Sequence, residues 1–143
     1  MASTRADYVV VIGCGRLGSY MAEHYSRRGS GVVVVDADRS AFDALSPEYS
    51  GFTLEGDARE LEVLERAKLD AADAVFVVTD SDNTNAMIGS VARNHFGRET
   101  VVVRIEDPRQ EAVFTAMNLQ VVCPTIMAAQ SALDDMQKLE DRS

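Results

Sequence analysis

Short apolar runs alternate along the chain with segments whose apolar residues recur at helical spacing. Two of the runs, 9–12 and 32–35, contain only Val and Ile. Strands that helices cover on both faces have this composition, whereas a half-exposed strand alternates apolar and polar residues. The pattern therefore predicts an α/β fold with a parallel sheet. The six predicted strands span residues 8–13, 31–36, 51–55, 74–79, 100–105 and 120–123.

Helical segments separate these strands. Gly29 and Gly97 stand where helices should end and Pro108 where one should begin, because Gly suits the position after a helix and Pro its first turn. Repeated strand–helix–strand units with right-handed crossovers predict a doubly wound, six-stranded parallel Rossmann sheet in the order 3-2-1-4-5-6. The predicted helices span residues 16–28, 39–45, 60–67, 83–96 and 108–117.

A last amphipathic segment, residues 125–139, follows Pro124. Its spacing predicts a helix with one apolar stripe. The stripe either packs back on the same sheet or leaves the domain and docks on a second subunit, as a dimerisation or crossover element. Amphipathicity does not name the partner, so both alternatives stay open. The stripe consists of Ile126, Ala129, Leu133, Met136 and Leu139.

Composition limits what the chain can do. Its 143 residues, 46% hydrophobic and 26% charged, suit one soluble globular domain over residues 1–143. A net charge of -9 argues against nucleic acid as a partner, because clustered Lys and Arg hold phosphate backbones. The N-terminus does not resemble a signal peptide, and no run approaches the ~18 apolar residues that span a bilayer. We therefore expect a cytoplasmic protein that reaches a membrane only through a partner. Cys14 and Cys123 lack metal-ligand spacing and are expected to be reduced and buried.

The sharpest motif is a glycine-rich loop directly after the first predicted strand. It has the G-x-G-x-x-G spacing of dinucleotide-binding folds, a helix follows it, and Asp36 ends the second strand. The first glycine makes the tight turn, the second lets the backbone approach a pyrophosphate, and the third lets the helix lie close to the sheet. The phosphates would then sit at the helix N-terminus. The loop reads Gly13-Cys14-Gly15-Arg16-Leu17-Gly18.

Asp36 is predicted to accept hydrogen bonds from the ribose hydroxyls of a nucleotide. A carboxylate there repels a 2′-phosphate and so disfavours NADP. Because Arg39 is close by, the exclusion of NADP is incomplete. The guanidinium of Arg16 could bind a terminal phosphate through two hydrogen bonds, or Arg16 could be a solvated residue at the start of a helix. Ala37, Asp38 and Arg39 complete this part of the predicted cofactor-binding set.

Polar residues also follow the third and fourth predicted strands, at the carboxyl edge of the sheet where such folds bind ligands. Asp57 could accept a hydrogen bond from an adenine amino group, or it could cap the next helix. Capping does not easily explain the density of polar groups after the fourth strand. The predicted set therefore also includes Gly56, Asp57, Ala58, Thr79, Asp80, Asp82 and Asn85.

The sequence contains no visible candidate for a catalytic residue. Neither His24 nor His95 is expected at the ligand edge as a general acid or base, and no catalytic constellation or metal motif is legible. Binding without chemistry is the simpler prediction, with no catalytic residues and no metal. The alternative is the cofactor-binding half of an NAD-dependent oxidoreductase.

Six short motifs are distributed along nearly the whole chain. They are Gly13-Cys14-Gly15-Arg16-Leu17-Gly18, Asp36, Gly56-Asp57-Ala58, Thr79-Asp80-Ser81-Asp82-Asn83-Thr84-Asn85, Arg104 with Asp107-Pro108, and Val121-Val122-Cys123-Pro124. With these six motifs in this order, the chain resembles the N-terminal domain of the regulator-of-K⁺-conductance (RCK) family, found in TrkA- and KtrA-type subunits of potassium transport. The motifs after the third, fourth and fifth strands are more specific than the glycine loop.

The resemblance implies a nucleotide-sensing domain that binds NAD(H) or ATP/ADP. It implies a homodimer formed through the sheet edge and the last helix, assembled into a ring that opens or closes a membrane-embedded K⁺ channel or transporter. By position, Arg16 corresponds to the family's phosphate contact, Asp36 to its ribose contact and Asp57 to its adenine contact, and Arg104 joins the predicted set.

Two features depart from the family pattern. Asn118 stands where many relatives have Gly, and Asn also tolerates left-handed geometry. A C-terminal ligand-binding domain usually follows in the family. We therefore expect either an excised domain or a single-domain relative whose second domain is a separate polypeptide.

Overall fold

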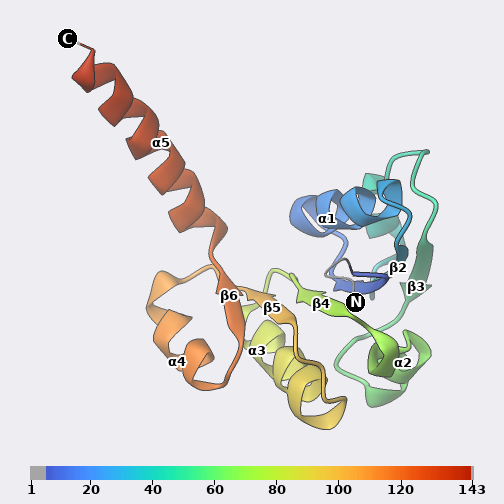
Figure 1. Ribbon diagram of the computed structural model, residues 1–143. Coiled ribbons are helices and arrows are strands. Elements are labelled where there is room, and N and C mark those ends of the chain that lie inside the picture. The colour runs from blue at the N-terminus through green and yellow to red at the C-terminus, as the bar shows by residue number, and fades with distance from the viewer. Residues whose placement is uncertain (1–5, 143) are drawn as a thin grey trace, which may run out of the picture.

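The computed structural model describes residues 6–142 and has a six-stranded sheet at its centre (Figure 1). All neighbouring strands pair in parallel, in the order β3-β2-β1-β4-β5-β6. The predicted fold and strand order are confirmed. Several strands end one or two residues earlier than predicted: β1 ends before Gly13 and β4 before Val78. The strands are β1 Tyr8–Ile12, β2 Gly31–Asp36, β3 Phe52–Glu55, β4 Ala74–Val77, β5 Val101–Arg104 and β6 Gln120–Val122.

The central strands are buried on both faces, as their unbroken apolar runs predict. Successive side chains of a strand point to opposite faces, so β1 contributes to two separate cores. Val9 and Val11 belong to the core beneath α1 (Arg16–Arg27) and the 3₁₀ helix η1 (Arg39–Ala44). Val10 and Ile12 belong to the larger core on the other face, which the remaining helices cover (Figure 1). These are α2 Leu61–Arg66, α3 Asp82–Ser90 and α4 Glu111–Ala116.

Three of the predicted helices, those over 39–45, 83–96 and 108–117, are not plain α-helices. Residues 39–44 form the 3₁₀ helix η1, whose N-cap Asp38 accepts from both the N–H and the hydroxyl of Ser40. The helix predicted over 83–96 widens after α3 into a π-helical turn, η3 (Val91–His95). The short 3₁₀ turns η2 (Leu69–Ala71) and η4 (Pro108–Gln110) precede β4 and α4.

Helix ends follow the predicted signals. Gly29 and Gly97 have positive φ after α1 and η3, and Pro108 opens η4. Asn118, which follows the end of α4, has φ of 61°. The expectation that Asn serves there in place of Gly is therefore confirmed.

The last helix, α5 (Pro124–Asp141), projects away from the sheet instead of covering it (Figure 1). Every residue from 125 to 142 is exposed, and Leu133 in the predicted stripe is 65% exposed. The alternative in which the stripe packs back on the same sheet is therefore wrong. Within residues 6–142, no helix is long and apolar enough to cross a membrane.

Candidate functional site

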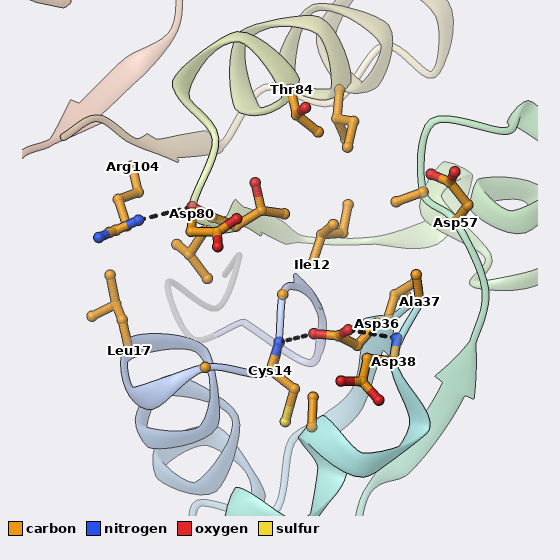
Figure 2. A pocket seen from close by; sticks show the side chains of 18 of the residues that line it. Ile12, Cys14, Leu17, Asp36, Ala37, Asp38, Asp57, Asp80, Thr84 and Arg104 are labelled. Atoms are coloured by element: carbon orange, nitrogen blue, oxygen red, sulfur yellow. Dashed lines mark hydrogen bonds between the residues drawn. The ribbon is translucent and has the colours of Figure 1, made fainter. Parts of the chain in front are cut away.

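A cavity of about 710 Å³ opens at the carboxyl ends of the strands, at β1, which has β2 on one side and β4 on the other (Figure 2). This is the switch point of a doubly wound sheet, at which ligands of such folds bind. Fourteen of the predicted residues line it. They are Gly13, Cys14, Gly15, Arg16, Leu17, Asp36, Ala37, Asp38, Gly56, Asp57, Ala58, Thr79, Asp80 and Arg104.

The glycine loop forms the floor of the cavity, and two of its glycines are required by close contacts. Gly13 turns with φ of 104°, and its N–H donates to the carbonyl oxygen of Val35 at 2.8 Å. A Cβ added to Gly18 would lie 1.8 Å from the carbonyl oxygen of Gly13, so only glycine lets α1 start this close to the turn. A Cβ on Gly15 would meet nothing within 4 Å. The roles predicted for the first and third glycines are confirmed, and the pyrophosphate over the second stays a prediction.

The N-terminus of α1 faces the cavity through Gly15, Arg16 and Leu17. The first N–H groups of any helix lack an intrahelical acceptor. Within the described residues no side chain caps α1, and its first turn carries no acidic residue. Its positive end is therefore directed at the cavity, which favours an anion there. Arg16 is exposed and adds a full positive charge at the same place.

Asp36 is tied into the loop by contacts that the sequence did not indicate. One carboxylate oxygen accepts from the backbone N–H of Cys14 at 2.8 Å, and the other accepts from the N–H of Asp38 at 2.8 Å (Figure 2). A carboxylate has about four acceptor positions, so about two remain for a ligand. Asp36 therefore both fixes the shape of the glycine loop and presents acceptors to the cavity.

Cys14 is a structural residue of the loop. Its side chain is 2% exposed, and Cys123 is also buried and free, so the prediction for both cysteines is confirmed. Burial raises the pKa of the Cys14 thiol to about 11, and the negative charges of Asp36 and Glu23 add to the rise. Because the thiolate is the reactive form, this thiol is unreactive at neutral pH.

Asp57 lines the cavity but is already paired. Its carboxylate binds the guanidinium of Arg59, with a closest distance of 2.7 Å, and accepts the backbone N–H of Arg59. These hydrogen bonds lower the pKa of Asp57 to about 2. The N-cap of α2 is Glu60, so the alternative in which Asp57 caps that helix is wrong. The predicted adenine contact stays open, in competition with Arg59.

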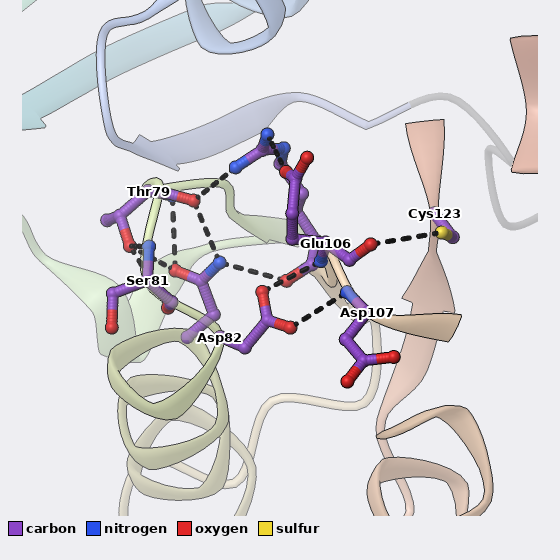
Figure 3. Close-up of polar contacts among 8 residues, drawn as sticks. Thr79, Ser81, Asp82, Glu106, Asp107 and Cys123 are labelled. Atoms are coloured by element: carbon purple, nitrogen blue, oxygen red, sulfur yellow. Dashed lines mark hydrogen bonds and ion pairs between the residues drawn. The ribbon is translucent and has the colours of Figure 1, made fainter. Parts of the chain in front are cut away.

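The polar cluster after β4 divides into residues that line the cavity and residues that fasten strands together. Asn85 is fully buried, and its amide donates to the carbonyl oxygens of Thr79 at 3.0 Å and Arg104 at 2.9 Å while accepting from Thr79 (Figure 3). Asp82 accepts the N–H groups of Glu106 and Asp107 (Figure 3). Asn85 therefore holds the ends of β4 and β5 together, and Asp82 holds the start of α3 to the segment after β5. Neither side chain lines the cavity.

Four predicted residues therefore do not line the cavity: Gly18, Arg39, Asp82 and Asn85. The sequence places residues at the carboxyl edge of a sheet but does not give the direction of each side chain. Other lining residues were missed. Some are apolar ends of strands, which a search of every strand end would have found, whereas Pro124 comes from the start of α5 with no local signal. The missed residues are Ile12, Val35, Ala41, Val78, Thr84, Ile88 and Pro124.

The sequence is similar to those of known proteins. The family described as TrkA-N domain matches residues 9–125. The Trk system potassium uptake protein TrkA of Streptomyces coelicolor is 33% identical over 129 residues, which make up 90% of this chain and 56% of that protein. This chain thus spans little more than half the length of that relative.

Solved structures share the fold at lower identity. The GsuK channel bound to NAD superimposes with a TM-score of 0.81 at 22% identity, over 98% of this chain and 25% of that chain. The Kef CTD of Shewanella denitrificans in AMP-bound form gives a TM-score of 0.77 at 21% identity, over 92% of this chain and 80% of that chain.

Proposed function

Because the chain belongs to the TrkA-N domain family, we propose that it is a nucleotide-sensing regulatory domain of K⁺ transport. Family membership confirms the resemblance drawn from the motifs. A nucleotide in the cavity would favour one arrangement between copies of the domain, and a membrane-embedded K⁺ channel or transporter would respond to that arrangement. The domain would then work in the cytoplasm, attached to the membrane through its transporter partner.

The observation that carries this proposal is the cavity at the mouth of α1. It combines a helix N-terminus, the glycine loop and the carboxylate of Asp36, which suit a phosphate and a ribose respectively. The ligand would be NAD(H) or ATP/ADP. Two structural relatives support an adenine nucleotide, since GsuK has been solved with NAD and the Kef CTD with AMP. We place the phosphates at Arg16, the ribose at Asp36 and the adenine near Asp57.

Asp36→Ala is expected to weaken adenine-nucleotide binding by about 1–3 kcal/mol, because the ribose hydroxyls lose their acceptor. Calorimetric titration with NADH and with ATP measures the change. The exposed carboxylate of Asp43, in η1, serves as a matched control, and Asp43→Ala should bind as the unaltered protein does. Because Asp36 also holds the N–H groups of Cys14 and Asp38, a denaturation curve of each variant must accompany the titration. Unchanged affinity in Asp36→Ala would place the ribose elsewhere.

The exposed stripe of α5 is the surface through which we expect two copies to associate. It consists of Ile126, Ala129, Leu133, Met136 and Leu139. Leu133→Glu should weaken dimerisation about tenfold or more, because it puts a charge into an apolar interface, and tenfold corresponds to ~1.4 kcal/mol. Ser131→Glu adds the same charge on the opposite face of α5 and should leave dimerisation unchanged. Sedimentation of both variants, with and without ATP or NADH, measures how strongly each one dimerises. Equal dimerisation in the two variants would move the interface away from this stripe.

The alternative function is the cofactor-binding half of an NAD-dependent oxidoreductase. The described residues that line the cavity include no histidine, and the nearby thiol of Cys14 has a raised pKa. We therefore propose binding without catalysis. Consumption of NADH with a small carbonyl compound would favour the oxidoreductase, whereas a ligand-dependent change in assembly favours regulation.

A further inference from the structure

The cavity carries few positive charges for a site that is to hold phosphates. Four carboxylates line it, from Asp36, Asp38, Asp57 and Asp80. Within the described residues, its cationic lining side chains are Arg16 and Arg104 alone. The N-terminus of α1 can bind only part of a long phosphate chain. The remaining phosphates must therefore bind one of these two guanidinium groups.

Arg104 stands at the far side of the cavity, at the end of β5 (Figure 2). Its side chain is 21% exposed, and one Nη donates to the carbonyl oxygen of Thr79 at 2.9 Å. The other Nη binds the carboxylate of Glu106 at 2.5 Å. A guanidinium group has five N–H donors in a rigid fork. The Nη that binds the Glu106 carboxylate is therefore also suited to bind a phosphate.

Glu106 has a fixed backbone and a solvent-exposed side chain. Its N–H donates to Asp82 at 2.7 Å, and its carbonyl oxygen lies 4.0 Å from the Sγ of Cys123, which donates to it (Figure 3). Its side chain is 60% exposed. The carboxylate can therefore leave Arg104 for solvent by side-chain rotation alone, without any movement of the strand ends.

We propose that Glu106 is an internal competitor for Arg104 and lowers the affinity of the cavity for ligands with an extended phosphate chain. This inference rests on the proposed nucleotide binding. A distal phosphate that binds the Nη of Arg104 held by Glu106 displaces this carboxylate, whereas a ligand that ends at its first phosphate leaves the Arg104–Glu106 pair intact. Glu106 is a positioning residue that acts through Arg104, and it makes the site discriminate between ligands by the length and charge of their phosphate chain.

Titration with adenosine, AMP, ADP and ATP, without Mg²⁺, tests this inference on the full chain. Glu106→Gln should bind ATP about threefold to fivefold more tightly, the range that a partly exposed ion pair supports, with a smaller gain for ADP and none for adenosine. Glu99→Gln makes the same charge change at the opposite end of β5 and should leave every affinity unchanged. An ATP gain in Glu99→Gln equal to that in Glu106→Gln would overturn the proposal.

A double-mutant cycle separates competition for Arg104 from general repulsion. Arg104→Gln should weaken ATP binding, and Glu106→Gln should then have no further effect in that background. An unchanged gain in the Arg104→Gln background, or no loss from Arg104→Gln itself, would show that Glu106 does not act through Arg104. If the original protein and every variant bind neither these four ligands nor NADH, the proposed function itself fails. Binding of AMP with no gain in Glu106→Gln for ATP overturns only the role of Glu106.

Discussion

Replacing Asn85 by Ala is expected to lower the free energy of unfolding by about 2–5 kcal/mol, because a buried donor or acceptor left without a partner costs about 1–3 kcal/mol. The amide of Asn85 is fully buried and serves the backbone of Thr79 and the carbonyl oxygen of Arg104. Its loss leaves these groups unsatisfied at the edge of the cavity. Urea denaturation, followed by circular dichroism, measures the change.

Asn83→Ala is the matched control for that experiment. Asn83 lies in the same helix, α3, and is exposed, so its replacement should change the stability by less than about 0.5 kcal/mol. Equal losses in the two variants would mean that the loss in Asn85→Ala reflects helix propensity and not the buried hydrogen bonds. A stable Asn85→Ala protein with unchanged nucleotide affinity would contradict the fastening role that we assign to this side chain.

Gly18→Ala is expected to reduce nucleotide affinity about tenfold or more and to destabilise the domain by about 1–3 kcal/mol, the usual cost of overpacking. The added Cβ would lie 1.8 Å from the carbonyl oxygen of Gly13, which cannot yield without moving the turn itself. The loop would then shift relative to the N-terminus of α1. Thermal unfolding and calorimetric titration with ATP and NADH measure the two effects.

Gly15→Ala separates the two effects. A Cβ on Gly15 meets nothing within 4 Å and Gly15 has φ of -86°, so the variant should lose no more than about 1 kcal/mol of stability, the usual cost of Ala at a helix N-cap. Its affinity should still fall, because the methyl group would occupy the space assigned to the phosphates. Full affinity in Gly15→Ala would mean that no phosphate approaches this part of the loop.

Most of the fold could be predicted from the sequence because buried parallel strands and turn residues leave local signals. The runs 9–12 and 32–35 indicate buried strands and lie in β1 and β2, and the predicted turn at Gly13 and close approach at Gly18 are both present. The direction in which α5 leaves the domain could not be predicted, since an apolar stripe packs equally well on its own sheet or on another copy.

The candidate site was predicted less completely. The glycine loop and Asp36 were found because each has a motif with a known spacing. Asp82 and Asn85 were assigned to the ligand because they follow a strand, yet their side chains turn back to bind the backbone. Pro124 lines the cavity only because β6 ends beside β5, a tertiary contact that no local pattern encodes.

A crystal structure of this chain with ADP or NAD would show directly where the nucleotide binds. We expect the phosphates against the N–H groups at the start of α1, beside Arg16, and the ribose hydroxyls within hydrogen-bond distance of the Asp36 carboxylate. A nucleotide at the amino ends of the strands, or a glycine loop left empty at saturating ligand, would contradict this placement.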